Sequence, residues 1–158
     1  MMVDYEEIEE IRSKDFHSVI DIIYESELID ESLLKTENAI AFIKYKLDRN
    51  KAKIFAKKDR DTPIAFMLLY YKVNHLSITR YNWHISYLYV KPAFRREKIG
   101  KQIMLKCIDY ARKTRVEHLS LNTDTENYAA HKLYEDLGFI RQNFIANYYS
   151  YELKLTNL

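Results

Sequence analysis

The chain has 158 residues, of which 47% are apolar and 30% are charged, and its formal net charge at pH 7 is +2. This length favours a single domain over residues 1–158, and the small net charge argues against a nucleic-acid binder that relies on a broad basic face. No apolar run approaches the roughly 20 residues that span a bilayer, and the N-terminus is acidic rather than a signal peptide. One cysteine allows no internal disulfide, so we expect a cytoplasmic protein with no nucleic-acid or membrane partner.

The N-terminal part of the sequence predicts one strand and two helices. Residues 3–11 partly alternate, as in an acidic edge strand. Asp15 is the expected N-cap of a first helix, and a second helix is expected over residues 36–47. Each helix has apolar side chains on one face, namely Phe16, Val19, Ile20, Ile23 and Tyr24 in the first and Ala39, Ile40, Phe42, Ile43 and Leu47 in the second.

Three strands are expected in the middle of the chain. Residues 53–56 and 64–73 have the composition of strands, and they flank a turn at residues 59–63. Residues 74–82 are expected to form a loop. This loop leads into an apolar, aromatic and β-branched run at residues 85–90, which is typical of a buried strand.

A basic turn and a helix follow this buried strand. Pro92 ends the strand because it has no N–H to donate to a sheet. The turn carries four cations and one carboxylate, which are Arg95, Arg96, Lys98, Lys101 and Glu97. From Ile99 onward, apolar residues recur at helical spacing, and the first turn of a helix is a natural seat for phosphate. Gly100 would let the backbone approach a ligand closely. The alternative is an ordinary solvated basic turn.

The C-terminal part predicts a strand, a helix and a terminal hairpin. Residues 118–122 alternate like a strand, and residues 127–137 have the pattern of a helix that Gly138 ends. A strand then begins at Phe139, and residues 148–155 alternate strongly as a last strand. Together the elements predict an α/β (α+β) fold with a mixed, mostly antiparallel central sheet and helices on both faces.

Two stretches resemble the GNAT superfamily of acetyl-CoA-dependent N-acetyltransferases. Residues 88–100 (L-Y-V-K-P-A-F-R-R-E-K-I-G) are similar to that family's strand and pyrophosphate loop, usually written Q/R-x-x-G-x-G/A. Residues 127–139 (N-Y-A-A-H-K-L-Y-E-D-L-G-F) are similar to its N-x-x-A-x-x-L-Y-x-x-x-G-F block. The first stretch departs from the pattern, because Lys98 stands where the middle glycine is usual. If the loop needs a positive φ there, a non-glycine residue costs about 1 kcal/mol, which a phosphate contact could offset.

The resemblance implies that acetyl-CoA binds at a splay between the central strand and the next one, with CoA as the product. It places the pantetheine arm along the strand, the pyrophosphate at the basic turn and the cofactor's amide near the second motif. The residues implied are Leu88, Tyr89 and Val90 on the strand, Arg95, Arg96, Glu97, Lys98, Ile99, Gly100 and Lys101 at the turn, and Asn127.

Transfer of an acetyl group from a thioester to an amine needs a neutral amine and a protonated leaving thiolate. The resemblance places Tyr134 near the thioester sulfur, and a phenol with a pKa near 10 is protonated at neutral pH and can donate to that sulfur. Many relatives place a carboxylate base on the central strand, where this chain has Ser86 and Tyr87. His84 is the candidate base on that strand. The carboxylates on the acceptor side are rival bases, namely Glu25, Glu27, Asp30 and Glu31, and a water chain without a dedicated base is a further alternative.

The acceptor is expected to be a small amine with a second positive charge. In the fold that the chain resembles, the connection between the first two helices overhangs the acceptor end. The resemblance therefore implies that the acidic residues of this connection attract the cation and, with Tyr87, form the acceptor side: Glu25, Glu27, Asp30 and Glu31. The alternative is that these carboxylates only solubilise the loop. Two other functions stay open, acetylation of a protein N-terminus or lysine and a non-catalytic module that binds acyl-CoA. A homodimer also stays open. The histidines lack metal-ligand spacing, so no metal is expected, and Cys107 is expected in the core.

Overall fold

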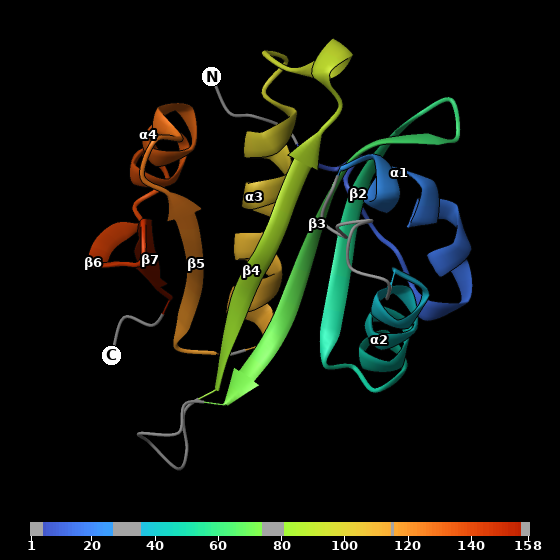
Figure 1. Cartoon of the computed structure of the whole chain (residues 1–158), viewed down its shortest axis with the longest axis horizontal. Helices are drawn as coiled ribbons and strands as arrows, with labels where there is room; N and C mark the ends of the chain where they lie inside the picture. The colour runs from blue at the N-terminus through green and yellow to red at the C-terminus, as the bar shows by residue number, and fades with distance from the viewer. Residues whose placement is uncertain (1–4, 27–35, 74–80, 115, 156–158) are drawn as a thin grey trace. The chain divides into compact units, whose positions relative to one another are not determined.

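The fold was analysed in a computed structural model, which describes residues 5–26, 36–73, 81–114 and 116–155. Seven strands of the described residues form one sheet in the order β1-β2-β3-β4-β5-β7-β6 (Figure 1). The elements in chain order are β1 (Glu9–Glu10), η1 (Ser13–Val19), α1 (Ile20–Glu25), α2 (Thr36–Asp48), β2 (Ala52–Asp59), β3 (Thr62–Val73), β4 (Tyr81–Val90), η2 (Pro92–Phe94), α3 (Ile99–Lys113), β5 (His118–Asp124), α4 (Tyr128–Asp136), β6 (Ile140–Ile145) and β7 (Tyr148–Lys154). The prediction of a mixed, mostly antiparallel sheet with helices is confirmed.

The chain forms two compact units. The first unit consists of Met1–Leu69 and Tyr87–Cys107. The second consists of Tyr70–Ser86 and Ile108–Leu158. Strands β3 and β4 and helix α3 each contribute residues to both units.

The N-terminal elements of the first unit differ from the prediction in length and in their start. β1 has two residues and pairs antiparallel with β2, Glu9 opposite Ala56, so the edge strand is much shorter than predicted. Asp15 is not an N-cap, because the 3-10 helix η1 begins at Ser13 and has Arg12 as its N-cap. The Asp15 N–H donates to the Arg12 carbonyl at 2.9 Å, which places Asp15 inside the first turn. A carboxylate still favours the helix dipole there.

Helix α2 matches its predicted bounds, but one predicted core residue is exposed. Ile43 and Leu47 are buried, whereas Phe42 is 52% exposed and lies under the Lys46 ammonium, whose nitrogen is 5.3 Å from the ring centroid. A cation over an aromatic face is a favourable surface contact, and it accounts for an exposed phenylalanine without a core role.

Strands β2 and β3 extend further into the predicted turn than expected. Only Arg60 and Asp61 separate them, and both have left-handed backbone, with φ of 51° and 71°. Two successive positive φ angles are the geometry of a tight two-residue hairpin. The strands supply the fully buried core of this unit, which includes Ile54, Phe55, Phe66, Met67, Leu68 and Leu69.

The sheet of the second unit combines a parallel and an antiparallel ladder. β4 pairs parallel with β5 from Asn82 opposite His118 to Ile85 opposite Leu121. β5 then continues to Asp124 while paired antiparallel with β7 along its whole length. In the described residues, the parallel ladder therefore ends three residues before β5 does.

Helix α4 lies beside the β6–β7 hairpin in the second unit, and β7 joins this hairpin to β5 (Figure 1). Gly138 has a φ of 95° just after the helix, which confirms its predicted role as the residue that ends it. The hairpin turns at Ala146 and Asn147, both left-handed, and β6 is the last strand in the sheet order.

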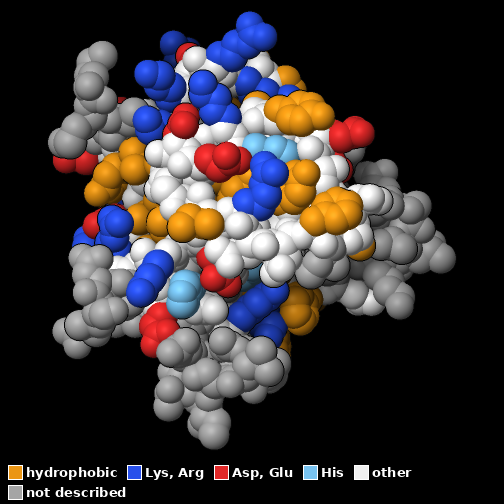
Figure 2. Space-filling model, turned by 90° about the vertical axis from the view of Figure 1, so that its left-hand side faces the viewer, with side chains coloured by type: hydrophobic (Ala, Val, Ile, Leu, Met, Phe, Trp, Pro, Cys, Tyr) orange, Lys and Arg blue, Asp and Glu red, His pale blue; other side chains and the backbone are white. Residues whose placement is uncertain are grey.

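Several large apolar side chains of the second unit are exposed. Figure 2 shows hydrophobic side chains among basic and acidic ones on one face of the molecule. The exposed residues of this kind on α4, β6 and β7 are Tyr128, Ile140, Phe144 and Tyr148. Among the residues that the structure describes, no helix is both long and apolar enough to cross a membrane.

Candidate active site

The predicted phosphate turn lies in the first unit, between the end of β4 and the start of α3. Lys91 N–H donates to the Ile64 carbonyl at 2.9 Å, which ties the end of β4 to β3. Pro92 begins the short 3-10 turn η2, as expected from a residue that cannot extend a sheet. The Arg95 Nε then donates to the Val90 carbonyl at 2.9 Å, and its guanidinium carbon lies 5.8 Å from the Tyr89 ring centroid. The Arg95 side chain therefore connects the turn to the end of β4.

The turn itself is formed by residues with left-handed backbone. Arg96 has a φ of 71° and Lys98 a φ of 61°, and both side chains are exposed. The middle position of the motif, where a glycine is usual, thus does take a positive φ with a lysine in place. A side chain with a Cβ costs about 1 kcal/mol or more in this conformation. The structure therefore shows the positive φ at Lys98 that the sequence pattern raised as a condition.

Helix α3 begins directly after this turn. Its first α-helical hydrogen bond runs from Gln102 N–H to the Lys98 carbonyl at 3.0 Å, so the N–H groups of Ile99, Gly100 and Lys101 precede that bond. The Ile99 side chain is 3% exposed and anchors the helix start in the core. The turn thus combines exposed cations with the positive end of a 15-residue helix.

The predicted acceptor residues that the structure describes are Glu25 and Tyr87, both in the first unit. The Tyr87 hydroxyl donates to the Ser26 carbonyl at 2.6 Å, at the end of α1. The Tyr87 ring stacks on Phe66 with centroids 6.0 Å apart. Glu25 is exposed and pairs with Lys91, Oε2 to Nζ at 3.7 Å. The other three predicted carboxylates, Glu27, Asp30 and Glu31, lie outside the described residues.

A surface hollow beside α1 contains a carboxylate that the sequence analysis missed. Asp21 and Glu25 lie four residues apart on α1, so they share a helix face, and both line this hollow together with Lys91. The rest of the lining is Ser18, Ile22, Thr62 and Pro63. The i, i+4 spacing of the two acids was visible in the sequence, but it gave no hint that β3 lies beside them.

The second motif forms helix α4 of the second unit. Asn127 is its N-cap, and the Asn127 Oδ1 accepts a hydrogen bond from Ala130 N–H at 3.2 Å. Tyr134 is 8% exposed, and its ring packs against Phe139 and Tyr151, each with centroids 6.0 Å away. Within the described part of the chain the Tyr134 hydroxyl makes no hydrogen bond. Burial raises the pKa of Tyr134 to about 12, so the phenol keeps its proton at neutral pH.

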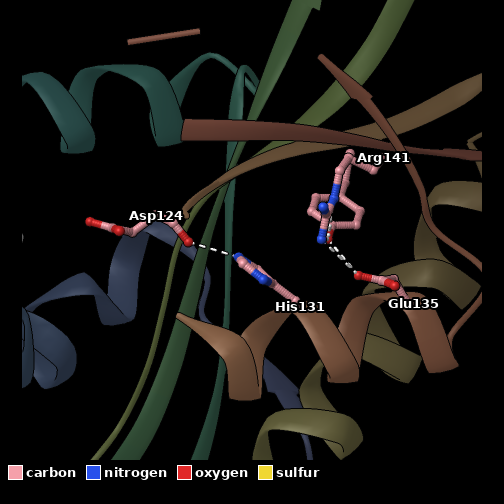
Figure 3. A network of polar contacts seen from close by, with 5 residues as sticks. Asp124, His131, Glu135 and Arg141 are labelled. Atoms are coloured by element: carbon pink, nitrogen blue, oxygen red, sulfur yellow. Dashed lines mark hydrogen bonds and ion pairs between the residues drawn. The ribbon is translucent and has the colours of Figure 1, made fainter. Parts of the chain in front are cut away.

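Polar contacts hold α4 to the strands beside it (Figure 3). His131 Nε2 donates to the Asp124 carbonyl at 2.8 Å. One turn later the Glu135 Oε2 accepts from the Tyr151 hydroxyl at 2.6 Å, and Arg141 Nη2 lies 3.4 Å from the same carboxylate oxygen. These contacts join residues far apart in the sequence, so the sequence pattern did not reveal them.

His84, the predicted base, lies on β4 in the second unit. Its Nδ1 is 2.8 Å from the Ser120 Oγ on the neighbouring strand β5. Burial, with a smaller effect from the positive charge of Lys72, lowers the pKa of His84 to about 4. His84 is therefore neutral at pH 7, as a base must be, but its low pKa makes it a weak proton acceptor.

Residues 5–139 match the sequence family described as the acetyltransferase (GNAT) family. The chain belongs to the GNAT family of acetyltransferases. The predicted resemblance is thus confirmed over most of the sequence, and with it the prediction of an N-acetyltransferase.

Curated relatives of this GNAT chain include two N-acetyltransferases. N-alpha-acetyltransferase 30 of Saccharomyces cerevisiae is 34% identical over 70 residues, which are 44% of this chain and 40% of that protein. The match therefore spans less than half of the yeast relative. The Bacillus subtilis protein YhfO, described as an uncharacterized N-acetyltransferase, is 27% identical over 112 residues, which are 71% of this chain and 74% of YhfO.

The fold of this GNAT chain is also that of solved acetyltransferase structures. The PaiA N-acetyltransferase from Thermoplasma acidophilum, solved in complex with coenzyme A, superposes with a TM-score of 0.72 at 20% identity. The superposition covers 93% of this chain and 98% of the Thermoplasma chain. At this level of identity the likeness establishes the fold.

Proposed function

We propose that this chain transfers an acetyl group from acetyl-CoA directly to a primary amine of a small cationic molecule. The observation that carries the acetyl-CoA part of the proposal is the turn at residues 95–98, where cations and left-handed backbone precede the start of α3. Family membership supports acetyl-CoA as the acyl donor, and the Thermoplasma structure contains coenzyme A.

The residues at the turn fit a pyrophosphate group. Arg96 and Lys98 are exposed and lie next to helix N–H groups that precede the first α-helical bond. Charge-assisted bonds from such groups bind phosphate oxygens well. Arg95 and Lys101 add two further cations, against the single carboxylate of Glu97. Leu88, Tyr89 and Val90 would line the pantetheine arm, and Asn127, with its Oδ1 used as a cap, would offer its Nδ2 to the cofactor's amide.

Tyr134 is the proposed proton donor. Acetyl-CoA, when bound, supplies an acetyl group activated as a thioester. The Tyr134 hydroxyl holds its proton at Oη across the neutral range, because its pKa is about 12, and no hydrogen bond to the described protein competes for it. We propose that Tyr134 gives a hydrogen bond to the leaving sulfur as negative charge develops there.

We propose His84 as the base that accepts the proton of the amine. The alternative is that the enzyme binds the neutral form of the amine and needs no protein base. A lysine-like amine has a pKa near 10.4, so on the order of one molecule in a thousand is neutral at pH 7. His84 is neutral and could accept a proton, yet its pKa of about 4 limits its strength. Direct capture of the neutral fraction of the amine, with water taking the proton, is the alternative.

The cationic acceptor is supported by the acidic side chains of α1. Asp21 and Glu25 line one hollow, and the hydrogen bond from Tyr87 to the Ser26 carbonyl fixes the end of that helix. Paired carboxylates lower the free energy of a nearby cation, and salt screens this attraction when the groups are exposed. Lys91 offsets part of the negative charge through its contact with Glu25.

A protein N-terminus is the second candidate acceptor. The similarity to N-alpha-acetyltransferase 30 favours it, since that relative is named for acetylation at an N-alpha position. The two acceptors differ in charge and in length. A diamine depends on the carboxylates of α1, whereas a peptide is selected by its first side chains.

Steady-state kinetics at low and high salt test the proposal. Spermidine, a neutral monoamine ester and a short peptide with a free α-amino group are compared at saturating acetyl-CoA. We expect spermidine to have the highest kcat/KM and its KM to rise with ionic strength more than that of acetyl-CoA. The variants Asp21→Asn and Glu25→Gln should raise the spermidine KM, and Glu126→Gln, an exposed acid of the second unit, should not. A peptide that outperforms spermidine at both salt concentrations would establish the second candidate instead.

A further inference from the structure

Helix α4 has nine residues and is fixed by two polar contacts one turn apart. His131 contacts the Asp124 carbonyl, and Glu135, four residues later, contacts the Tyr151 hydroxyl. Figure 3 shows His131 and Glu135 projecting from successive turns of this helix toward Asp124 and Arg141. Tyr134 stands between the two anchored residues in the sequence, so the rotation of α4 about its axis sets the direction of the Tyr134 side chain.

Tyr151 is the centre of the second anchor. Its side chain is fully buried, and its hydroxyl donates to Glu135 Oε2 at 2.6 Å. The Tyr151 hydroxyl oxygen in turn accepts from Arg141 Nε at 3.1 Å and from Arg141 Nη2 at 3.0 Å. The Arg141 guanidinium also lies on the Tyr149 ring, 3.9 Å from its centroid. Glu135 on α4, Arg141 on β6 and Tyr151 on β7 thus form one closed set of contacts.

The ring of Tyr151 reaches Tyr134 as well. The two ring centroids are 6.0 Å apart with an angle of 59° between the planes. Tyr151 therefore packs against the Tyr134 ring and also binds the residue next to Tyr134. Because the Tyr134 hydroxyl has no hydrogen bond of its own within the described chain, packing and the orientation of α4 determine where that hydroxyl points.

We infer that the Glu135–Tyr151–Arg141 set positions the Tyr134 hydroxyl for its role as proton donor. Tyr151 is a positioning residue, and it acts through α4 without touching the reacting atoms. This inference rests on the proposed function, in which Tyr134 donates to the leaving sulfur. Loss of the Tyr151 hydroxyl would leave Glu135 with its longer contact to Arg141 at 3.4 Å. The weaker anchor would let α4 rotate and displace the Tyr134 hydroxyl while leaving the basic turn of the first unit unchanged.

A first test uses the protein alone. Tyrosine labelled with carbon-13 at the ring carbon that bears the hydroxyl gives one signal for each tyrosine, and Tyr134→Phe assigns the Tyr134 signal by its loss. We expect this signal to shift or broaden in Tyr151→Phe and in Glu135→Ala. It should not change in Tyr149→Phe, which removes a hydroxyl from the same strand β7. An unchanged Tyr134 signal in both of the first two variants overturns the inference.

A second test is a double-mutant cycle in kcat. The acceptor is spermidine, or the peptide if it proves to be the better acceptor. Tyr151→Phe should lower kcat roughly tenfold, within the range known for small misplacements of catalytic groups, and leave the KM for acetyl-CoA unchanged. In a Tyr134→Phe background the same change should cost nothing further. Equal losses in both backgrounds would assign Tyr151 a general structural role and refute the inference. Wild-type turnover in Tyr134→Phe alone would instead remove the proposed role of Tyr134, and the inference with it.

Glu135→Ala guards the test against misfolding of Tyr151→Phe. Glu135 is exposed, so its truncation leaves the core intact. Glu135→Gln keeps an oxygen acceptor for the Tyr151 hydroxyl and should restore most of the kcat that Glu135→Ala loses. A kcat that is equally low in both Glu135 variants would show that the negative charge, rather than the hydrogen bond, matters, and would contradict positioning through Tyr151.

Discussion

Replacement of Lys98 by glycine separates the strain in the basic turn from its binding role. Lys98 has a φ of 61°, where a residue with a Cβ is less stable than glycine by about 1–2 kcal/mol. Glycine loses about 0.5–1 kcal/mol more conformational entropy on folding, so Lys98→Gly should stabilise the protein by roughly 0.5–1 kcal/mol. For a chain of this length, that difference corresponds to a rise in Tm of about 2 °C.

The same change should weaken acetyl-CoA binding. It removes one cation from the turn, and an exposed charge-assisted contact contributes on the order of 1 kcal/mol, which is roughly a fivefold change in Kd. Thermal unfolding measures the first effect and titration calorimetry at low salt measures the second. Stability and affinity are therefore expected to change in opposite directions.

Arg60→Gly is the matched control for Lys98→Gly. Arg60 is also exposed and left-handed, with a φ of 51°, but it lies in the turn between β2 and β3. The control should gain similar stability and bind acetyl-CoA like the wild type. If Lys98→Gly gains no stability while Arg60→Gly does, the inference that the backbone at Lys98 is strained is wrong. If both variants bind acetyl-CoA equally well, the phosphates do not contact Lys98.

Three further predictions concern binding, catalysis and pH dependence. Arg96→Ala should weaken acetyl-CoA binding by about 1 kcal/mol or more, less so at high salt, and an unchanged Kd by calorimetry would place the phosphates elsewhere. Tyr134→Phe should lower kcat, measured by CoA release, by on the order of ten- to a thousandfold and leave the Kd for acetyl-CoA unchanged. Wild-type turnover in this variant would leave Tyr134 as a core aromatic. The free energy of unfolding should fall as the pH is lowered from 6.5 toward 4, because unfolded histidine binds a proton in this range and buried His84, with a pKa of about 4, does not. Urea unfolding of His84→Gln should show a smaller fall, and an equal fall would mean that other groups cause it.

Local sequence patterns predicted most of the fold. The Ile99 helix start, the Gly138 helix end and the terminal hairpin follow from side-chain spacing and turn chemistry, which act over a few residues. The predicted start of the first helix was wrong. Asp15 is a good cap by residue type, but the helical turn already begins at Ser13, and the Asp15 N–H donates to the Arg12 carbonyl. Phe42 was placed in the core because spacing does not distinguish burial from a surface contact with Lys46.

The candidate site was predictable only where a motif carries it. The turn around Lys98 and the helix with Tyr134 are continuous stretches, so the sequence could reveal both. The set formed by Glu135, Arg141 and Tyr151 comes from three elements, and Asp21 gains its interest from the hollow beside α1. Such groupings depend on tertiary packing, which residue spacing does not specify.

The most direct test of the central claim is an internal competition for acetyl groups. Spermidine, a neutral primary amine and a peptide with a free α-amino group are mixed at equal concentration with acetyl-CoA and the enzyme, and mass spectrometry quantifies each acetylated product at early times. The product ratio gives the ratio of kcat/KM values for the acceptors. We predict that acetylspermidine dominates at low salt and loses part of its lead at high salt. Preferential acetylation of the neutral amine or of the peptide at low salt would contradict a cationic small-molecule acceptor.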